Sequence, residues 1–129
     1  MKRMALFFFF VVATMKINAQ DEYIGQSKNY IINDYSEYQI LNNNDSILTF
    51  NYCGMLHSFY FLDGSVLCNA IVCEMTTLDM KKEIRYLAYL KLIYNEQNQR
   101  YYDPVLKCRI WFQRSERNKK LVEMWFTQL

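Results

Sequence analysis

The chain has 129 residues, a formal net charge of +2 and a hydrophobic content of 52%. With 3 glycines, 1 proline and 17% aromatic residues, a disordered or fibrous class is excluded. A chain of this length forms one ordinary domain that can bury its own core.

The N-terminus has the organisation of a secretory signal peptide. Two bases, Lys2 and Arg3, precede an apolar run from Met4 through Ala13. A membrane-spanning helix needs about 20 apolar residues, and Lys16 interrupts this run well before that length. A cleavable export signal is therefore favoured over a permanent membrane anchor.

Cleavage is predicted after Ala19, where the chain has the small residue that signal peptidase requires, with cleavage after Gln20 as the alternative. Residues 1–19 are then the signal peptide, and residues 20–129 are a single mature domain. The Ala19–Gln20 junction resembles that of exported proteins of Bacteroidota-type bacteria. This resemblance implies a periplasmic, cell-surface or secreted location and no particular activity.

Cleavage also changes the charge of the chain, because it removes three bases and no acid. Twelve bases then face thirteen acids. Proteins that bind polyanions usually carry a clear basic excess, so nucleic acid is not expected as a partner. Residues 21–80 hold eight acids and one base, whereas residues 107–129 hold six bases and two acids. The two segments either neutralise each other or leave a basic hairpin that docks an acidic partner.

The mature domain is predicted to be an α+β fold. An antiparallel, meandering sheet of about five to seven strands has two helices packed mainly on one face. Apolar residues at helical spacing predict the first helix from Glu22 to Tyr35. The second helix is predicted to begin after the capping residue Thr76, with Asp79 three positions later.

Two hairpins are predicted in the middle of the chain. Asp63 and Gly64 form the pair that a type I′ turn prefers, and a two-residue turn there places Phe59 opposite Cys68. A second two-residue turn is predicted at Cys53 and Gly54. The core face of the sheet then consists of apolar side chains and the one histidine: Leu48, Phe50, Tyr52, Met55, His57, Phe59, Phe61, Val66, Cys68, Ala70 and Val72.

Two final strands are predicted, at about 106–114 and 119–127, with a loop at 115–118. Alternation puts Trp111 and Trp125 on the outer face, with Arg109 and Lys107 nearby. Since Trp and Arg contribute strongly to interface energy, these four residues are the predicted interaction surface. The alternative is that the two tryptophans only pack on each other across the hairpin or against neighbouring residues.

The four cysteines, Cys53, Cys68, Cys73 and Cys108, all belong to the mature domain. An even number in an exported chain predicts one or more disulfides, and the alternative is four small buried side chains. Because no Cys-x-x-Cys pair occurs, neither a metal site nor a thioredoxin-like redox site is expected.

Other chemistry has little support in the sequence. His57 is predicted to be buried, and no nucleophile or orienting carboxylate is recognisable beside it, so no catalytic residue is assigned. The glycines stand alone and cannot form a phosphate-binding loop, so no cofactor is expected.

Ser46 is a candidate glycosylation site. The triplet Asn44-Asp45-Ser46 fits the N-glycosylation pattern, and Asp45-Ser46-Ile47 resembles the O-glycosylation motif of exported Bacteroidota proteins.

The leading hypothesis is a small exported, non-enzymatic binding module for a protein, envelope or glycan partner. One alternative is a small carbohydrate-active or hydrolytic enzyme that uses Asp or Glu. Another is a structural accessory subunit of an envelope complex. No stable membrane span is expected after cleavage, and the sequence leaves the oligomeric state open.

Overall fold

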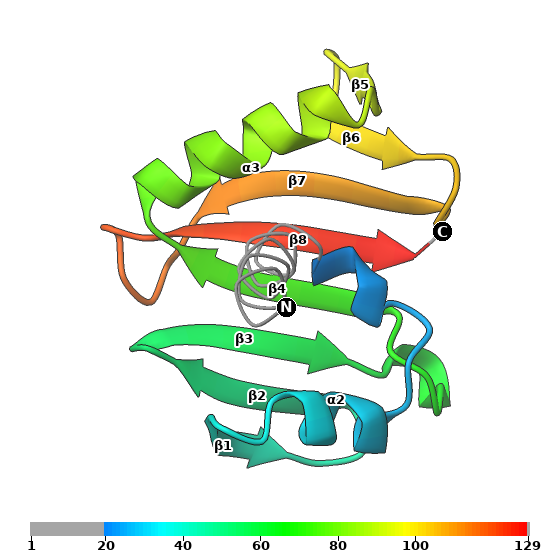
Figure 1. Ribbon diagram of the computed structural model, residues 1–129, viewed down its shortest axis with the longest axis vertical. Helices are drawn as coiled ribbons and strands as arrows, with labels where there is room; N and C mark the ends of the chain where they lie inside the picture. The colour runs from blue at the N-terminus through cyan, green and yellow to red at the C-terminus, as the bar shows by residue number, and fades with distance from the viewer. Residues whose placement is uncertain (1–19, 129) are drawn as a thin grey trace, which may run out of the picture.

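The computed structural model describes residues 20–128 and contains one eight-stranded antiparallel sheet and two α-helices (Figure 1). The helical elements are η1 (Gln20–Tyr23), α2 (Lys28–Asp34), η2 (Leu62–Gly64) and α3 (Thr77–Tyr89), where η denotes a 3-10 turn. The strands are β1 (Gln39–Asn43), β2 (Ile47–Tyr52), β3 (Met55–Tyr60), β4 (Ala70–Met75), β5 (Ile93–Asn95), β6 (Arg100–Asp103), β7 (Cys108–Arg114) and β8 (Val122–Gln128). The α+β class is confirmed, with eight strands rather than five to seven. The predicted signal peptide and its cleavage site after Ala19 lie outside the described residues.

The strands follow the order β1-β2-β3-β4-β8-β7-β6-β5 across the sheet. Each half of the domain is an α-helix followed by a four-strand meander, and the last strands of the two halves, β4 and β8, lie side by side in the centre. This repetition of elements occurs although the sequence shows no internal repeat. The edges of the sheet are β1 and β5.

Both α-helices lie on the same face of the sheet, in front of it in Figure 1. Ile31 of α2 and Leu87 of α3 belong to one core cluster with residues from the strands, among them Phe59 and Ile110. The core therefore lies between this face and the helices. None of the helices within residues 20–128 has the length and apolar composition needed to cross a bilayer.

The second helix begins as predicted, whereas the first is broken in two. The Thr76 hydroxyl oxygen accepts a hydrogen bond from the Asp79 N–H at 3.2 Å. In the first helix, the Gly25 N–H donates instead to the carbonyl oxygen of Cys68 at 2.7 Å. Helix α2 then restarts after Ser27, which caps it. A contact with a distant segment thus interrupts a stretch that has helical spacing.

The β2–β3 hairpin has the predicted turn and register. Cys53 and Gly54 both have positive φ angles, 54° and 85°, the conformation that a type I′ turn requires and that glycine adopts without a steric penalty. Leu48 consequently lies opposite Phe59.

The turn predicted at Asp63 and Gly64 is present, but it does not join two directly paired strands. The two residues have φ angles of 58° and 72°, and the Ser65 N–H closes the turn at 3.1 Å. Pairing between β3 and β4 nevertheless starts only at Tyr60 and Ala70. The predicted register is therefore wrong.

The cause is that residues 61–69 contact the segment before α2 instead of extending the strands. Ser27 and Leu67 form an isolated bridge. The Cys68 N–H also donates to the carbonyl oxygen of Gln26 at 2.8 Å. These contacts take up residues that the prediction had placed in the hairpin.

The resulting three-residue shift exchanges the two faces of β4. Phe59 lies opposite Ile71 rather than Cys68. Because side chains alternate along a strand, an odd shift turns each of them to the other face. Val72, predicted to face the core, lies on the face away from the helices, and Val66 is 81% exposed.

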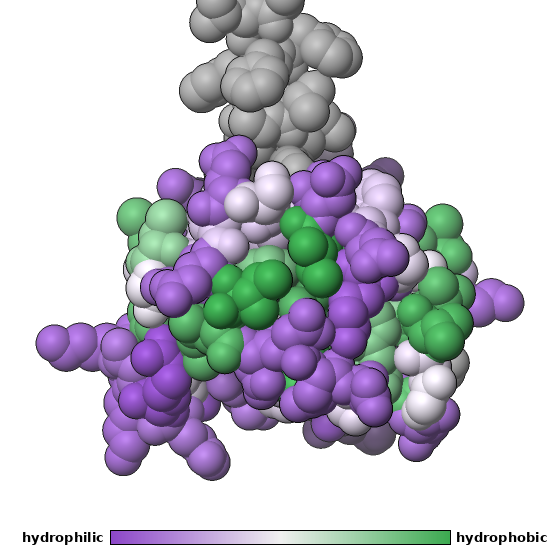
Figure 2. All heavy atoms as spheres, turned by 90° about the horizontal axis from the view of Figure 1, so that it is seen from below, coloured by the Kyte–Doolittle hydropathy of each residue, from purple (hydrophilic) through white to green (hydrophobic). Residues whose placement is uncertain are grey.

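The edge strand β1 carries exposed apolar side chains. Ile40 is 41% exposed and Leu41 is 49% exposed. Figure 2, viewed from the side where β1 lies, shows a compact hydrophobic patch surrounded by hydrophilic residues. The strand also contains an irregularity between Ile40 and Asn42, a feature that discourages edge-to-edge pairing.

Candidate interaction surface

The face of the sheet away from both helices presents a mixed aromatic and polar surface. Ile110 and Phe126 face the core, so their sequence neighbours point to the opposite side. On β7 and β8 this side carries Arg109, Trp111, Gln113, Glu123, Trp125 and Thr127. Neither α2 nor α3 covers it (Figure 1).

The two tryptophans lie directly opposite each other on β7 and β8. Their rings are stacked, with centroids 5.5 Å apart and an interplanar angle of 13°. The guanidinium of Arg100, on β6, lies over the Trp111 ring, 4.3 Å from its centroid. Trp125, Trp111 and Arg100 therefore form one continuous stack across three neighbouring strands, and all three side chains are partly exposed.

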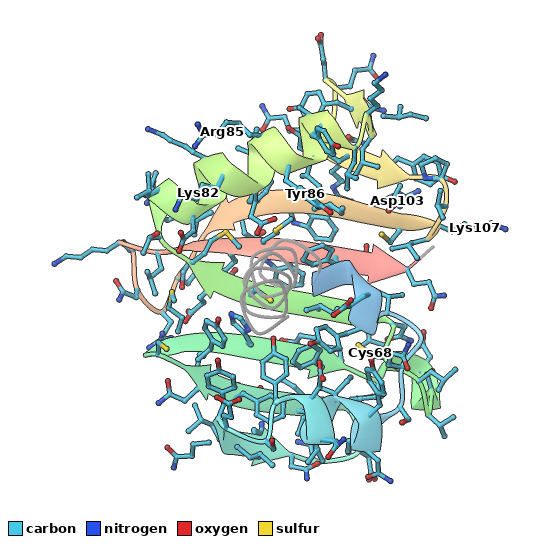
Figure 3. All side chains as sticks on the ribbon, viewed as in Figure 1. Cys68, Lys82, Arg85, Tyr86, Asp103 and Lys107 are labelled. Atoms are coloured by element: carbon cyan, nitrogen blue, oxygen red, sulfur yellow. The ribbon has the colours of Figure 1, made fainter. Side chains whose placement is uncertain are left out.

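The other two predicted residues are placed differently from each other. Arg109 is exposed on the same face, opposite Tyr102 of β6 and Thr127 of β8. Lys107 lies in the β6–β7 turn with a φ angle of 53°, and its side chain points away from the sheet (Figure 3). Arg109 thus adjoins the stack, and Lys107 does not.

Arg100 is the member of this surface that sequence reasoning missed. Strand β6 begins at Arg100, one residue before the pair Tyr101 and Tyr102 that is typical of a strand, and nothing in the sequence indicates its pairing with β7. Tyr102 lies opposite Arg109, and this register brings Arg100 beside Trp111. Pro104 lies in the turn that joins β6 and β7.

Several hydrogen-bond donors on this surface face solvent. Within residues 20–128, neither the Trp111 indole N–H nor the guanidiniums of Arg100 and Arg109 have a hydrogen-bond acceptor or an ion pair. By contrast, the Trp125 indole N–H donates to the Glu123 carboxylate at 3.2 Å. The surface can therefore offer positive charge and N–H groups to a ligand.

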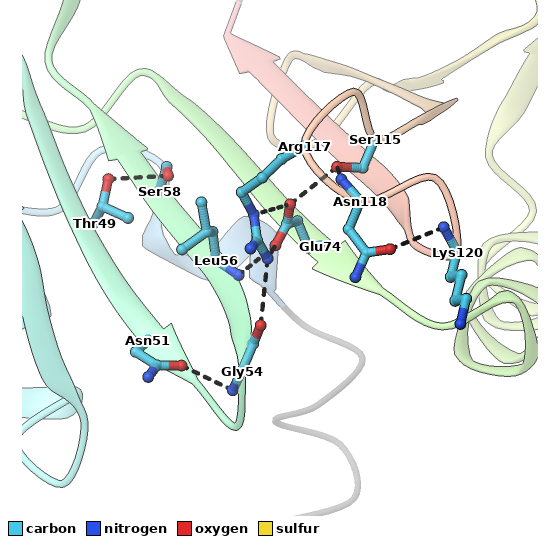
Figure 4. Close-up of polar contacts among 10 residues, drawn as sticks. All are labelled: Thr49, Asn51, Gly54, Leu56, Ser58, Glu74, Ser115, Arg117, Asn118 and Lys120. Atoms are coloured by element: carbon cyan, nitrogen blue, oxygen red, sulfur yellow. Dashed lines mark hydrogen bonds and ion pairs between the residues drawn. The ribbon is translucent and has the colours of Figure 1, made fainter.

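A buried carboxylate forms a second polar cluster on the same face (Figure 4). Glu74 on β4 is only 2% exposed. It accepts hydrogen bonds from the Leu56 N–H at 2.7 Å, the Ser115 hydroxyl at 3.0 Å and Arg117 Nε at 3.0 Å. Arg117 also donates to the Gly54 carbonyl oxygen at 3.3 Å. One charge of the basic segment is thus neutralised by one acid of the acidic segment.

The pKa values of this ion pair follow from its contacts. Burial acts to raise the pKa of Glu74, but the hydrogen bonds from Arg117, Leu56 and Ser115 outweigh it and hold the pKa below its usual value. The hydrogen bond to Glu74 raises the pKa of Arg117. The pair is therefore ionised at neutral pH and links three segments of the chain.

His57 is a core residue, as predicted. It is 5% exposed, its Nδ1 lies 2.9 Å from the Tyr35 hydroxyl, and its ring stacks on Tyr52 with centroids 4.3 Å apart. Burial lowers the pKa of His57 to about 4 and raises the pKa of Cys73, which lies opposite it on β4. At neutral pH the imidazole is uncharged and the thiol is protonated, so the pair lacks the thiolate that nucleophilic catalysis uses.

A small cavity adjoins His57. It is lined partly by the acidic residues Glu74, Asp79 and Glu83, and its volume is about 50 Å³. Small-molecule sites usually have volumes of about 300 Å³ or more, so this cavity is too small to hold a sugar ring. Within residues 20–128 no three His, Cys, Asp or Glu side chains come together as a metal site.

The predicted disulfides are absent. No bond joins any two of Cys53, Cys68, Cys73 and Cys108, all of which lie within the described residues. Cys53 is exposed at the β2–β3 turn, and the other three are buried. Burial raises the pKa of Cys68 to about 11. The buried cysteines therefore serve as small core residues, which was the alternative interpretation of the sequence.

Ser46 is exposed in the connection between β1 and β2. Its N–H donates to the Asn44 side-chain oxygen at 2.9 Å, which orders this connection. The hydroxyl that would carry a glycan therefore lies on an accessible loop.

Comparison of the chain with protein-family models, curated proteins and solved structures found no match.

Proposed function

We propose that the mature domain is a non-enzymatic binding module. Its docking site is the Trp–Arg surface, defined as Arg100, Arg109, Trp111 and Trp125. The observation that carries this proposal is the stack of Trp125, Trp111 and Arg100 on a sheet face that neither described α-helix covers. Trp and Arg are the residues that most often dominate the free energy of protein interfaces.

The packing of the Trp111 ring favours a protein over a glycan as the partner. Sugar C–H groups pack on an open, electron-rich face of an aromatic ring. Strand β7 lies between β8 and β6, so Trp125 and Arg100 approach Trp111 from opposite sides. Both faces of Trp111 are then occupied, and a partner meets the ring edges and the N–H donors instead.

We further propose that the domain acts outside the cytoplasm, in the periplasm, at the cell surface or in the medium. The support is the signal-like N-terminal sequence. Ser46 is proposed as a glycosylation site of the exported chain, supported by its sequence motif and exposed position. An intact mass that shows sugar on the exported protein and on an Asn44→Gln variant, but none on a Ser46→Ala variant, would test this assignment, because Ser46→Ala alone also removes the motif for a glycan on Asn44.

Site-specific photo-crosslinking in cells tests the docking site. A photoreactive amino acid is placed at Gln113, exposed on the Trp–Arg face, or at Lys82, exposed on α3. We expect one discrete protein adduct from Gln113 and none from Lys82. The double variant Trp111→Ala, Trp125→Ala should lose the adduct while keeping a folded circular dichroism spectrum.

Equal adducts from both positions, or none from Gln113, would contradict the proposal. The partner identified in the adduct must also bind the purified chain, and the double variant must weaken that binding. Lys82 is a suitable control because its side chain points away from the sheet on the helix side (Figure 3).

A further inference from the structure

The Trp–Arg surface also indicates the chemistry of its partner. We propose that it binds an extended acidic peptide segment, whose carboxylates pair with Arg100 and Arg109. This inference rests on the proposed docking function and specifies the partner that the surface recognises.

Arginine and aromatic residues alternate both along strands β6 and β7 and across the pair. Tyr102 lies opposite Arg109, and Arg100 lies over Trp111. Along each strand, the arginine and the aromatic residue are two positions apart and share one face. The two guanidiniums therefore occupy diagonal corners of a four-residue square, and the aromatic rings occupy the other two corners.

The donors of this square are complementary to a ligand that supplies acceptors. Stacking on Trp111 uses the flat face of the Arg100 guanidinium and leaves its N–H edge open. Arg109 is exposed, and within residues 20–128 neither arginine has a carboxylate partner. Guanidinium and indole groups can only donate hydrogen bonds, and arginine binds carboxylates most strongly through paired N–H groups.

The neighbouring charges favour an acidic partner. On the same face, Glu123 already accepts hydrogen bonds from Gln113 and Trp125. Of the other exposed bases, Lys107 lies in the β6–β7 turn, two residues before Arg109, whereas Lys119 and Lys120 lie in the loop beyond the other end of β7. The square itself thus carries two positive charges and no carboxylate, and an acidic segment complements it.

The spacing favours an extended segment with acids at alternate positions. Cross-strand neighbours are about 5 Å apart and residues two apart on a strand about 7 Å apart, so the diagonal between the two arginines is about 8 Å at the backbone. Side chains at alternate positions of an extended peptide point to one side, about 7 Å apart. Two such carboxylates can reach both guanidiniums at once.

The test uses the full chain as purified from its producing cells. Fluorescence anisotropy compares a labelled peptide of alternating Glu and Thr with one of alternating Gln and Thr. We expect the acidic peptide to bind at least about tenfold more tightly, and Arg100→Gln and Arg109→Gln each to weaken it roughly tenfold. The double variant Lys119→Gln, Lys120→Gln removes two charges from the β7–β8 loop, outside the square, and should change binding less than about twofold.

Four results would overturn the inference. These are equal binding of the two peptides, no binding of the acidic peptide, an equal loss from the lysine double variant, or tighter binding of polygalacturonate than of the acidic peptide. The last result would identify an acidic glycan instead. If the Gln113 photo-adduct persists in the variant lacking Arg100 and Arg109, docking is correct and carboxylate pairing is wrong. If the native chain gives no adduct, the docking function itself fails.

Discussion

Arg117, in the loop between β7 and β8, donates to the buried carboxylate of Glu74 on β4, 43 residues earlier in the chain. The same guanidinium reaches the carbonyl oxygen of Gly54 in the β2–β3 turn. One side chain therefore connects two hairpins that are not neighbours in the sheet (Figure 4). The ion pair fixes the loop beside the Trp–Arg surface.

Glu74→Gln should destabilise the domain by on the order of 2 kcal/mol. The substitution keeps the shape of the side chain but removes the negative charge to which Arg117 and Ser115 donate hydrogen bonds. Removing one partner of a buried charged pair usually costs several kcal/mol of stability. Urea unfolding measures the change. Glu116→Gln, an exposed acid of the same loop, should stay within about 0.5 kcal/mol of the native chain. Equal effects from both variants would show that the pair contributes nothing specific.

The free energy of unfolding should fall on acidification in two steps. Burial lowers the pKa of His57 from 6.5 to about 4, so the unfolded chain takes up a proton that the folded domain does not. The His57 contribution is therefore present above about pH 6.5 and is lost as the pH falls towards 4. The pKa of Glu74 is held below 4.5, so its contribution is present above about pH 4.5 and is lost at lower pH.

Urea midpoints measured from pH 7 down to well below pH 4 distinguish these two groups. His57→Phe retains a ring on Tyr52 and should remove roughly 3 kcal/mol of the decrease between pH 6.5 and 4. Glu74→Gln should lower the urea midpoint throughout the range above about pH 4.5 and should abolish only the further decrease that the native chain shows below that pH. An unchanged profile in His57→Phe would show that the histidine is not the cause.

The stack of Trp125, Trp111 and Arg100 should show measurable coupling in the free protein. A double-mutant cycle with Trp111→Ala and Trp125→Ala is expected to give about 0.5–1.5 kcal/mol, the value for stacked aromatic pairs. A second cycle for Arg100 and Trp111 should give about 0.5–1 kcal/mol. A cycle between Trp125 and the distant, exposed Tyr89 is the control. A coupling free energy of similar size there would show that the measured coupling does not come from the stack.

The four cysteines should differ in their accessibility to thiol reagents. In the folded protein only Cys53 is exposed, so a maleimide should label one site, and urea should reveal three more. The variant Cys53→Ser should leave the native protein unlabelled. A mass lower by two hydrogens than that of the reduced chain would instead demonstrate a disulfide.

The exported protein should begin at Gln20, with Asp21 as the alternative first residue. N-terminal sequencing of protein recovered outside the cytoplasm tests this. Replacing Ala19 with a bulky residue such as Leu should block cleavage, because signal peptidase requires a small side chain there. Recovery of the chain with its original N-terminus from the cytoplasm would contradict export.

The sequence predicted those features that depend on local chemistry. The turn at Cys53 and Gly54 has the expected backbone conformation, and the strands on either side of it pair directly. Thr76 caps α3 for the same reason, since the cap needs only residues three positions apart. Alternation along β7 and β8 likewise placed both tryptophans on one face.

Long-range contacts determined what the sequence did not reveal. At Asp63 and Gly64 the predicted turn forms, yet bonds from Cys68 to the segment before α2 change the register of β4. The position of Arg100 beside Trp111 depends on the pairing of β6 with β7. The contacts of Arg117 with Glu74 and with the Gly54 carbonyl oxygen join residues 43 and 63 positions apart in the chain. Propensity and periodicity carry no information about such distances.

The position of β8 in the centre of the sheet has a consequence for how the chain acquires its structure. Until Val122–Gln128 has left the ribosome, β4 and β7 both lack a neighbour that they have in the finished domain. A chain that lacks β8 therefore exposes two unpaired strand edges, whose free backbone N–H and C=O groups can pair with other chains. The sheet therefore closes only when β8 is added between β4 and β7, and a truncation that removes Val122–Gln128 should leave both halves of the domain without their shared central neighbour.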